Sequence, residues 1–171
     1  MPLDPLWTCP VCAQTFVSRN MPHSCQVVGL ERFFEGVAPE LRELFDRYMA
    51  AARGNGDVIV NATKSRIAIQ VRGRFAGIER PRKRYLVATF VLTRPIDSPR
   101  FTRIEYVPPY YYVHRLRLAR PEDIDDELLG WLAEAYEVGA QRHVSDPDWL
   151  KQRRPPDWVH VLGVRSGAAG R

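Results

Sequence analysis

Apolar residues recur every three to four positions in three parts of this chain, and this spacing places them on one face of an α-helix. The clearest case is residues 39–53, where Pro39 suits the first helical turn and Gly54 suits the position after the last. A shorter apolar stripe predicts a helix that begins near Leu30 and ends near Gly36. The expected buried stripe of the long helix consists of Leu41, Leu44, Phe45, Tyr48, Met49 and Ala52.

A third helix is predicted over residues 123–141, where the apolar stripe again repeats at helical spacing. Asp123 is expected to cap its start, and the acidic residues that follow lie where the helix dipole favours negative charge. The expected buried stripe consists of Leu128, Trp131, Leu132, Ala135, Tyr136 and Gly139.

Between the second and third helices the apolar period changes to two, which indicates β-strands. Residues 66–72 would place isoleucine and valine on one face and polar residues on the other, whereas residues 85–93 are apolar on both faces. The second pattern is typical of a central strand that is covered on both sides. Pro108 and Pro109 interrupt the last pair of strands, because proline has no N–H to donate. The predicted strands span residues 57–63, 66–72, 75–80, 85–93, 103–107 and 110–118.

Short loops join these strands, and no helix crosses over between them, so they are expected to pair as antiparallel neighbours. The predicted fold class is α+β, with a mainly antiparallel sheet of five or six strands packed with helices. A small module that contains all the cysteines precedes this domain.

The length of 171 residues suits one core with a small appended module. The expected units are residues 1–27, an α+β domain over residues 28–145, and a C-terminal extension over residues 146–171. In that extension Trp149 and Trp158 are expected to pack on the domain, and the last residues form a partly disordered tail. No apolar run approaches the ~20 residues of a membrane span, and no signal-peptide pattern is visible, so a cytoplasmic location without membrane contact is expected.

All three cysteines lie within seventeen positions, together with one of the four histidines. Cys9 and Cys12 form a C-x2-C pair, and His23 and Cys25 follow as H-x-C. This is the ligand set of a tetrahedral structural zinc site, with thiolate sulfur at ~2.3 Å from the ion. Buried reduced thiols would be scattered along the chain, and a redox C-x-x-C would open a helix within a βαβ unit. The sequence therefore predicts a zinc knuckle.

Four protein ligands fill the coordination shell of zinc and leave no position for an activated water. The predicted Zn2+ is therefore structural, and its binding is expected to fold the first 27 residues, which cannot bury enough apolar surface alone.

The first half of the knuckle, C-P-V-C-A-Q-T-F, is similar to the hairpin of a C2H2 zinc finger. The second half departs from that pattern, because ten residues rather than ~12 separate the inner ligands, and the H-x-C ligands cannot share one helical face. A helix that reads bases in the major groove is therefore not expected here.

The N-terminal motif resembles a family of uncharacterised bacterial proteins in which W-x-C-P-x-C, an aromatic residue and N-x-x-H-S-C precede a small α+β domain of unknown function. A weaker pattern of apolar positions extends the resemblance over most of residues 7–142, through T-K-S-R-I-A-I and D-E-L-L-G-W-L-A-E-A-Y. A similar domain is found fused to predicted transport and nuclease-related proteins. The resemblance implies a metal-stabilised accessory or binding protein and supplies no established reaction. The matching N-terminal residues are Trp7, Cys9, Cys12, Phe16, Asn20, His23, Ser24 and Cys25.

The net charge of +5 is unevenly distributed along the chain. Residues 53–118 hold fourteen Lys or Arg against four acidic residues, whereas residues 119–150 hold two Arg against nine. The two segments either neutralise each other or form solvated faces, or the basic one forms an anion-binding surface. Basic groups beside tyrosines would hold single-stranded nucleic acid or another polyanion. The residues predicted to form such a surface are Lys64, Arg66, Arg72, Arg74, Arg82, Lys83, Arg84, Tyr112, His114, Arg115 and Arg117.

Two other functions stay open: a pocket for a small anionic ligand with Lys64, Arg84 and His114 as its charged groups, and a protein adaptor. An enzyme is the least supported class, because the remaining histidines are isolated. The sequence also contains no glycine-rich phosphate loop, no H-E-x-x-H motif and no serine elbow. The expected function is thus that of a zinc-binding accessory protein without catalytic residues.

Overall fold

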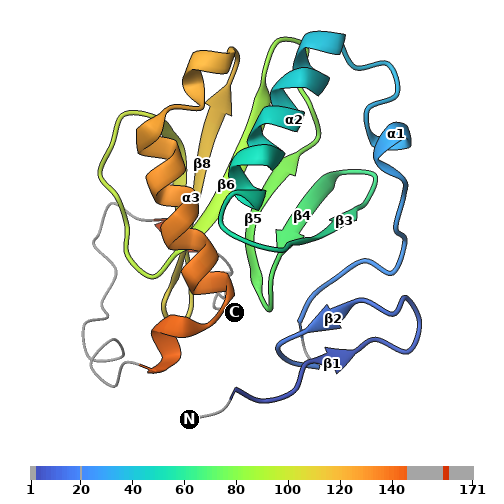
Figure 1. Ribbon diagram of the computed structural model, residues 1–171, viewed down its shortest axis with the longest axis vertical. Helices are drawn as coiled ribbons and strands as arrows, with labels where there is room; N and C mark the ends of the chain where they lie inside the picture. The colour runs from blue at the N-terminus through green and yellow to red at the C-terminus, as the bar shows by residue number, and fades with distance from the viewer. Residues whose placement is uncertain (1–2, 20, 146–159, 162–171) are drawn as a thin grey trace, which may run out of the picture.

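The computed structural model describes residues 3–19, 21–145 and 160–161 (Figure 1). Two helices lie on one face of a sheet, and a two-stranded hairpin lies beside the sheet at the N-terminal end of the chain. The helices and strands are β1 (Trp7–Thr8), β2 (Thr15–Phe16), α1 (Leu30–Phe33), α2 (Pro39–Arg53), β3 (Ile59–Ala62), β4 (Arg66–Gln70), β5 (Arg74–Glu79), β6 (Leu86–Leu92), β7 (Phe101–Val107), β8 (Tyr111–Leu118), η1 (Pro121–Asp123), α3 (Asp126–Gly139), η2 (Arg142–Ser145) and β9 (His160–Val161).

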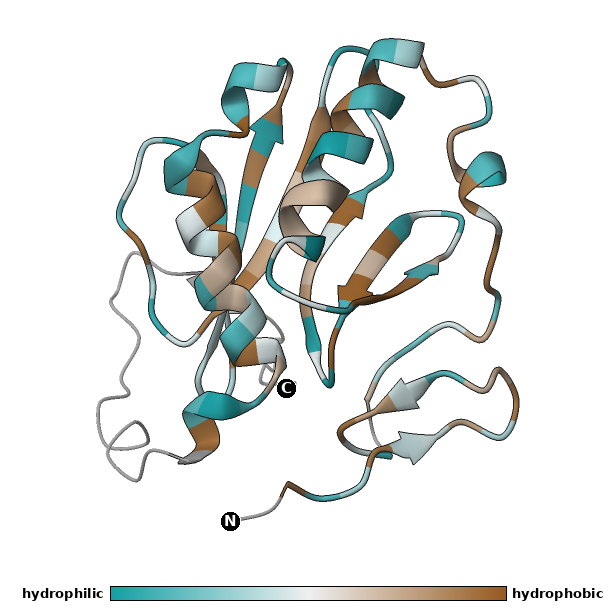
Figure 2. Ribbon diagram, viewed as in Figure 1, coloured by the Kyte–Doolittle hydropathy of each residue, from teal (hydrophilic) through white to brown (hydrophobic). Residues whose placement is uncertain are grey.

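The strands of the large sheet are ordered β3-β4-β5-β6-β8-β7-β9. The six strands from β3 to β8 pair in antiparallel fashion, which confirms the predicted α+β class and the antiparallel sheet. The two-residue β9 adds a parallel pairing at the edge, with Glu105 opposite His160. In β8 buried and less buried residues alternate, and Figure 2 shows the matching alternation of hydrophobic and hydrophilic residues along this strand.

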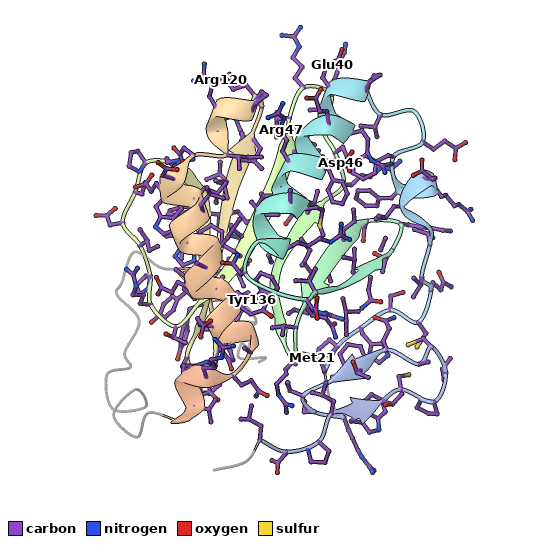
Figure 3. The ribbon with its side chains drawn as sticks, viewed as in Figure 1. Met21, Glu40, Asp46, Arg47, Arg120 and Tyr136 are labelled. Atoms are coloured by element: carbon purple, nitrogen blue, oxygen red, sulfur yellow. The ribbon has the colours of Figure 1, made fainter. Side chains whose placement is uncertain are left out.

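The main core lies between the sheet and helices α2 and α3. All six residues of the stripe predicted for α2 are buried, and all six predicted for α3 are buried as well. Tyr48 is fully buried on α2, and its hydroxyl donates a hydrogen bond of 2.9 Å to the carbonyl oxygen of Thr89 on β6. Tyr136 reaches from α3 to the turn before β3, where its hydroxyl donates to the carbonyl oxygen of Asp57 (Figure 3).

The start of the last helix differs from the prediction. Asp123 does not cap α3 but belongs to the preceding 3-10 turn, where its carboxylate accepts from the backbone N–H groups of Ala119 and Arg120. Asp125 caps α3 instead, because its side chain accepts from the N–H of Leu128 at 3.0 Å. Several acidic residues in a row could each serve as the cap, and only the preceding turn decides which one does.

The prediction that β6 is covered on both sides is wrong. Leu86, Ala88, Phe90 and Leu92 are buried on the helix side, whereas the alternate residues are only half-buried. The valines and the threonine on the second face of β6 are common both on partly exposed and on fully buried sheet faces. The sequence alone therefore does not tell whether this face is covered.

Several predictions of the sequence stay untested. The packing of Trp149 and Trp158 and the C-terminal tail lie outside the described residues, and so does Asn20 of the N-terminal motif. The unit boundaries after residues 27 and 145 remain predictions. In the described part of the chain, no helix combines the length and the apolar character that a membrane crossing needs.

Two glycines of α3 differ in the space around them, and this difference predicts opposite effects on stability. A Cβ on Gly139 would lie 2.8 Å from the Cβ of Phe75, whereas a Cβ on the exposed Gly130 would have no neighbour within 4 Å. Gly139→Ala should therefore lower the free energy of unfolding by roughly 1–3 kcal/mol. Gly130→Ala should raise it by up to about 1 kcal/mol through helix propensity. Urea unfolding of both variants measures the difference, and equal midpoints would contradict this packing.

Candidate metal centre

The four predicted metal ligands converge in the structure. The ligand atoms of Cys9, Cys12, His23 and Cys25 all lie within 4.8 Å of one another. The β1–β2 hairpin carries the first two, and the segment that returns after it carries the other two. Three sulfurs and one ring nitrogen in one cluster form a donor set suited to a metal ion.

The turn between β1 and β2 shapes the first half of the cluster. The N–H of Cys9 donates to the carbonyl oxygen of Gln14, and the N–H of Ala13 donates to the carbonyl oxygen of Cys9, both at 2.9 Å. Ala13 closes the turn with a positive φ of 58°. The N–H groups of Cys12 and Val11 donate to the sulfur of Cys9, which lowers the pKa of this thiol to about 6. The turn therefore favours a thiolate before any ion binds.

Two of the separations between ligand atoms agree with a tetrahedral ion. Sulfurs bound at ~2.3 Å in tetrahedral geometry are separated by about 3.8 Å, and the sulfurs of Cys9 and Cys25 are 3.8 Å apart. A bound sulfur and nitrogen should be separated by about 3.5 Å, and the sulfur of Cys25 lies 3.4 Å from Nε2 of His23. A disulfide would need a sulfur separation of about 2.05 Å, so the cysteines are free thiols placed as ligands.

The cluster also lacks the positive charge that several thiolates need. Desolvation and the neighbouring Cys12 and Cys9 sulfurs raise the pKa of Cys25 to about 11. Deprotonation of Cys25 beside the other sulfurs is therefore unfavourable, because negative charges would lie close together. A divalent cation between them would remove this repulsion.

His23 is oriented for binding through Nε2. Its Nδ1 lies 3.0 Å from the carbonyl oxygen of Met21, which accepts a hydrogen bond from the Nδ1–H tautomer and leaves Nε2 free. This contact with Met21 is also the largest cause of the raised pKa of His23. The ring packs 4.3 Å from the buried ring of Phe16, which in turn contacts Trp7.

Gln14 joins the two halves of the cluster. Its side-chain amide is buried and donates to the sulfur of Cys12 at 3.4 Å and to the carbonyl oxygen of Ser24 at 3.0 Å. The metal-ligand pattern does not include Gln14, although a side chain two residues after Cys12 can reach back to the turn. We call residues 7–25, with this network, the metal knuckle.

The metal knuckle lies next to the β3–β4 hairpin (Figure 1), where side chains of β4 and β5 hydrogen-bond to it. Gln70 is buried there and donates to the carbonyl oxygen of Thr15 at 3.0 Å. Arg74 donates to the carbonyl oxygen of Pro22 at 3.1 Å, and its guanidinium lies over the ring of Phe16. Arg72 donates to the carbonyl oxygen of Asp4 and to Gln141. Arg74, predicted as a binding residue, therefore holds the knuckle in place, and Arg72, also predicted as one, connects the segment before the knuckle with Gln141.

Two other predicted binding residues have buried side chains, so they do not lie on an exposed surface. Tyr112 packs with Ile104 and Tyr106 in a second apolar cluster. His114 is fully buried, and its Nε2 accepts a hydrogen bond from the backbone N–H of Ile96 at 3.1 Å. Burial lowers the pKa of His114 to about 4, so the ring is neutral and cannot serve an anion as a charged group.

Arg115 has internal partners of its own. Its guanidinium forms ion pairs with Glu79 at 2.6 Å and with the buried Glu105. Glu105 also pairs with Arg103, at 2.7 Å. The guanidinium of Arg115 therefore neutralises two carboxylates on the sheet. This ion-pair network gives Arg115 a structural role and not a role in anion binding.

The other predicted binding residues are exposed and gather at one end of the sheet. The β3–β4 turn, the β5–β6 loop and the end of β8 meet there, since Arg66 pairs with Glu79 and Leu86 with Leu118. Arg120 marks this end at the upper edge of Figure 3. Within the described residues, none of these cations forms an ion pair. This basic end consists of Lys64, Arg66, Arg80, Arg82, Lys83, Arg84 and Arg117.

The fold and the cluster together define an α+β protein with an N-terminal Cys3His cluster that could hold a metal ion. Residues 30–139 match the family described as a domain of unknown function (DUF5655), which covers more than half of the chain, so the chain belongs to this family. The matched span begins after the knuckle, so the family does not by itself account for the metal ligands. No curated protein and no solved structure matches the chain.

Protons compete with the metal for these ligands, which predicts a pH-dependent affinity. The Cys25 thiol, with a pKa of about 11, must lose its proton on binding, and each proton released raises the affinity about tenfold per pH unit. Cys9, with a pKa of about 6, adds a further proton only at lower pH, so the dependence should steepen as the pH falls through about 6. Competition with a chelating indicator measures the affinity across this range.

The controls for this titration are Ser24→Ala and Cys25→Ser. Ser24 lies between two ligands, yet its side chain is not a ligand, so Ser24→Ala should keep the slope of the unaltered chain. Cys25→Ser should bind more weakly and with a shallower slope, because one displaced proton is missing. An affinity that does not change between about pH 6 and about pH 8 would contradict the assignment.

Proposed function

We propose that this chain is a zinc-stabilised binding protein in which one Zn2+, held by Cys9, Cys12, His23 and Cys25, has a structural role. The observation that carries the proposal is the agreement between the 3.8 Å and 3.4 Å ligand separations and the edges of a tetrahedral zinc site. Three soft sulfurs favour zinc over the hard cations magnesium and calcium. With four protein ligands, the ion has no open position for substrate or water, so the role is architectural.

The architectural role is supported by what the knuckle lacks. Its buried apolar residues do not belong to the main core, which is built from residues of the α+β domain. Its contacts with that domain include hydrogen bonds from Gln70 and Arg74. A segment with so little core of its own depends on the ion for its fold.

We propose further that the basic end binds nucleic acid or another polyanion. Seven exposed cations converge on it from three segments of the chain, and the described carboxylates do not pair with them. Arg117 lies over the ring of Tyr85, 4.8 Å from its centre, and this pair offers a flat face on which a base can stack. Successive phosphate groups of a flexible single-stranded nucleic acid could contact several of these cations at the same time.

A cytoplasmic accessory role without catalysis, as expected from the sequence, agrees with this proposal. The protein-adaptor alternative rests only on the fused occurrence of the similar domain, and no feature of the described residues favours it. The small-anion alternative requires a different site from the predicted one, because His114 is buried.

Removal of the ion should unfold the knuckle and leave the domain folded. Chelation should abolish hydrogen-exchange protection of the amides in residues 7–25 and keep that of strands β4 to β8, because the main core contains no knuckle residue. Cys12→Ser should give the same result without a chelator. Ser18→Ala, an exposed polar position in the same module, is the matched control. Unchanged protection of the knuckle after complete removal of the metal would refute the structural role.

Neutralising the basic loop should weaken polyanion binding. Replacing Arg82, Lys83 and Arg84 by Gln should lower the affinity for labelled single-stranded DNA and RNA. The slope of log affinity against log salt concentration should become shallower by roughly three, about one for each lost phosphate contact. Fluorescence anisotropy at low and moderate salt measures both quantities.

The matched control removes the same charge elsewhere, by replacing Arg19, Arg53 and Arg142 with Gln. None of these three belongs to the basic end, so this variant should bind almost as well as the unaltered chain. Equal losses in the two variants, or no binding by the unaltered chain at low salt, would overturn the proposal.

A further inference from the structure

A cleft of about 320 Å³ lies between the metal knuckle and the β3–β4 hairpin. Gln14, His23 and Ser24 of the knuckle line one side of it, and Asn61, Ser65 and Arg66 of the hairpin line the other. Its volume lies at the lower end of the range for small-molecule sites. Neither segment forms the cleft alone, so it exists only when the knuckle is docked.

The cleft is strongly positive. Arg66 and Arg74 both line it, and no lining residue is acidic. Within the described part of the chain, neither guanidinium forms an ion pair, and the buried Nε of Arg74 has no hydrogen-bond partner. Burial and the charge of Arg66 lower the pKa of Arg74, which means that the two cations repel each other.

The metal knuckle balances only part of this charge. Three thiolates around a divalent ion carry one net negative charge, which offsets one guanidinium and leaves the other. A half-buried positive charge without a counterion is costly, and an anion in the cleft removes that cost.

We propose that this cleft binds a phosphate group, free or as a phosphate monoester, between Arg66 and Arg74 on the sheet and Ser24 on the knuckle. Planar guanidinium groups bind phosphate oxygens through paired N–H donors. The hydroxyl of Ser65 and the side-chain amide of Asn61 supply further donors from the hairpin.

The arrangement favours a tetrahedral oxyanion over a carboxylate. Donors approach from both walls of the cleft, which suits oxygens that point in several directions, whereas a carboxylate presents two oxygens in one plane. The volume exceeds that of a single phosphate, so the organic part of a small monoester fits as well. The inference depends on the proposed zinc site, because the docked knuckle forms one wall, but it does not require polyanion binding.

The test is a ¹H–¹⁵N NMR titration of the zinc-loaded full chain with inorganic phosphate, with glycerol phosphate as the monoester and with succinate as the dicarboxylate, at constant ionic strength. Both phosphates should cause saturable shifts at the amides of Ser24, Ser65, Arg66 and Arg74, and succinate should bind at least about tenfold more weakly. Equal binding of succinate, or shifts spread over the whole basic end, would overturn the proposal.

Arg66→Gln and Lys83→Gln form a matched pair, because both residues are exposed and both changes remove one charge. Arg66→Gln should weaken phosphate binding at least about tenfold, and Lys83→Gln should leave it unchanged. Equal losses would show a general electrostatic effect and refute the site.

The metal content of the same sample separates this proposal from the one on zinc. One equivalent of zinc without phosphate shifts would refute the cleft and leave the zinc site standing. Saturable shifts at the cleft in a chain that binds no metal would support the cleft and refute the zinc site.

Discussion

The clustered side chains of Cys9, Cys12, His23 and Cys25 connect the two halves of a segment that has almost no core of its own. The turn at Cys9 and Cys12 favours a thiolate through backbone N–H donors, whereas the second half brings His23 and Cys25 beside it. Without a cation, the thiol of Cys25 keeps its proton, so the two halves lose their strongest connection. Under the proposed coordination, every feature that needs a docked knuckle, including the cleft above β3 and β4, would depend on the ion.

The cations of residues 53–118 serve three different purposes, although they form one basic segment of the sequence. Arg74 holds the knuckle, Arg115 neutralises two glutamates on the sheet, and the exposed residues of the basic end have no acidic partner among the described residues. The net charge of a sequence segment does not distinguish these roles. Strand register and side-chain partners separate them, and they leave a smaller and more compact basic surface than the sequence indicated.

The sequence predicted those features that depend on neighbours close in the chain. The apolar stripe from Leu41 to Ala52 predicts both the helix and its buried face. The spacing of the ligand residues from Cys9 to Cys25 predicts their cluster. Features that depend on distant contacts could not be predicted. Gln70 alternates with isoleucines like a solvated strand residue, yet it is buried because Thr15, far away in the chain, covers it. His114 directly precedes Arg115, yet it lies on the buried face of β8 with Leu116, where it accepts a hydrogen bond from the N–H of Ile96.

The central claim concerns the identity and the coordination of one ion. X-ray absorption at the zinc edge, on protein purified without chelator, tests it most directly. Zinc bound as proposed gives three sulfur neighbours at ~2.3 Å and one nitrogen neighbour at ~2.0–2.1 Å, at one equivalent per chain. A first shell made of oxygen, an added water ligand, or far less than one equivalent of zinc would contradict it.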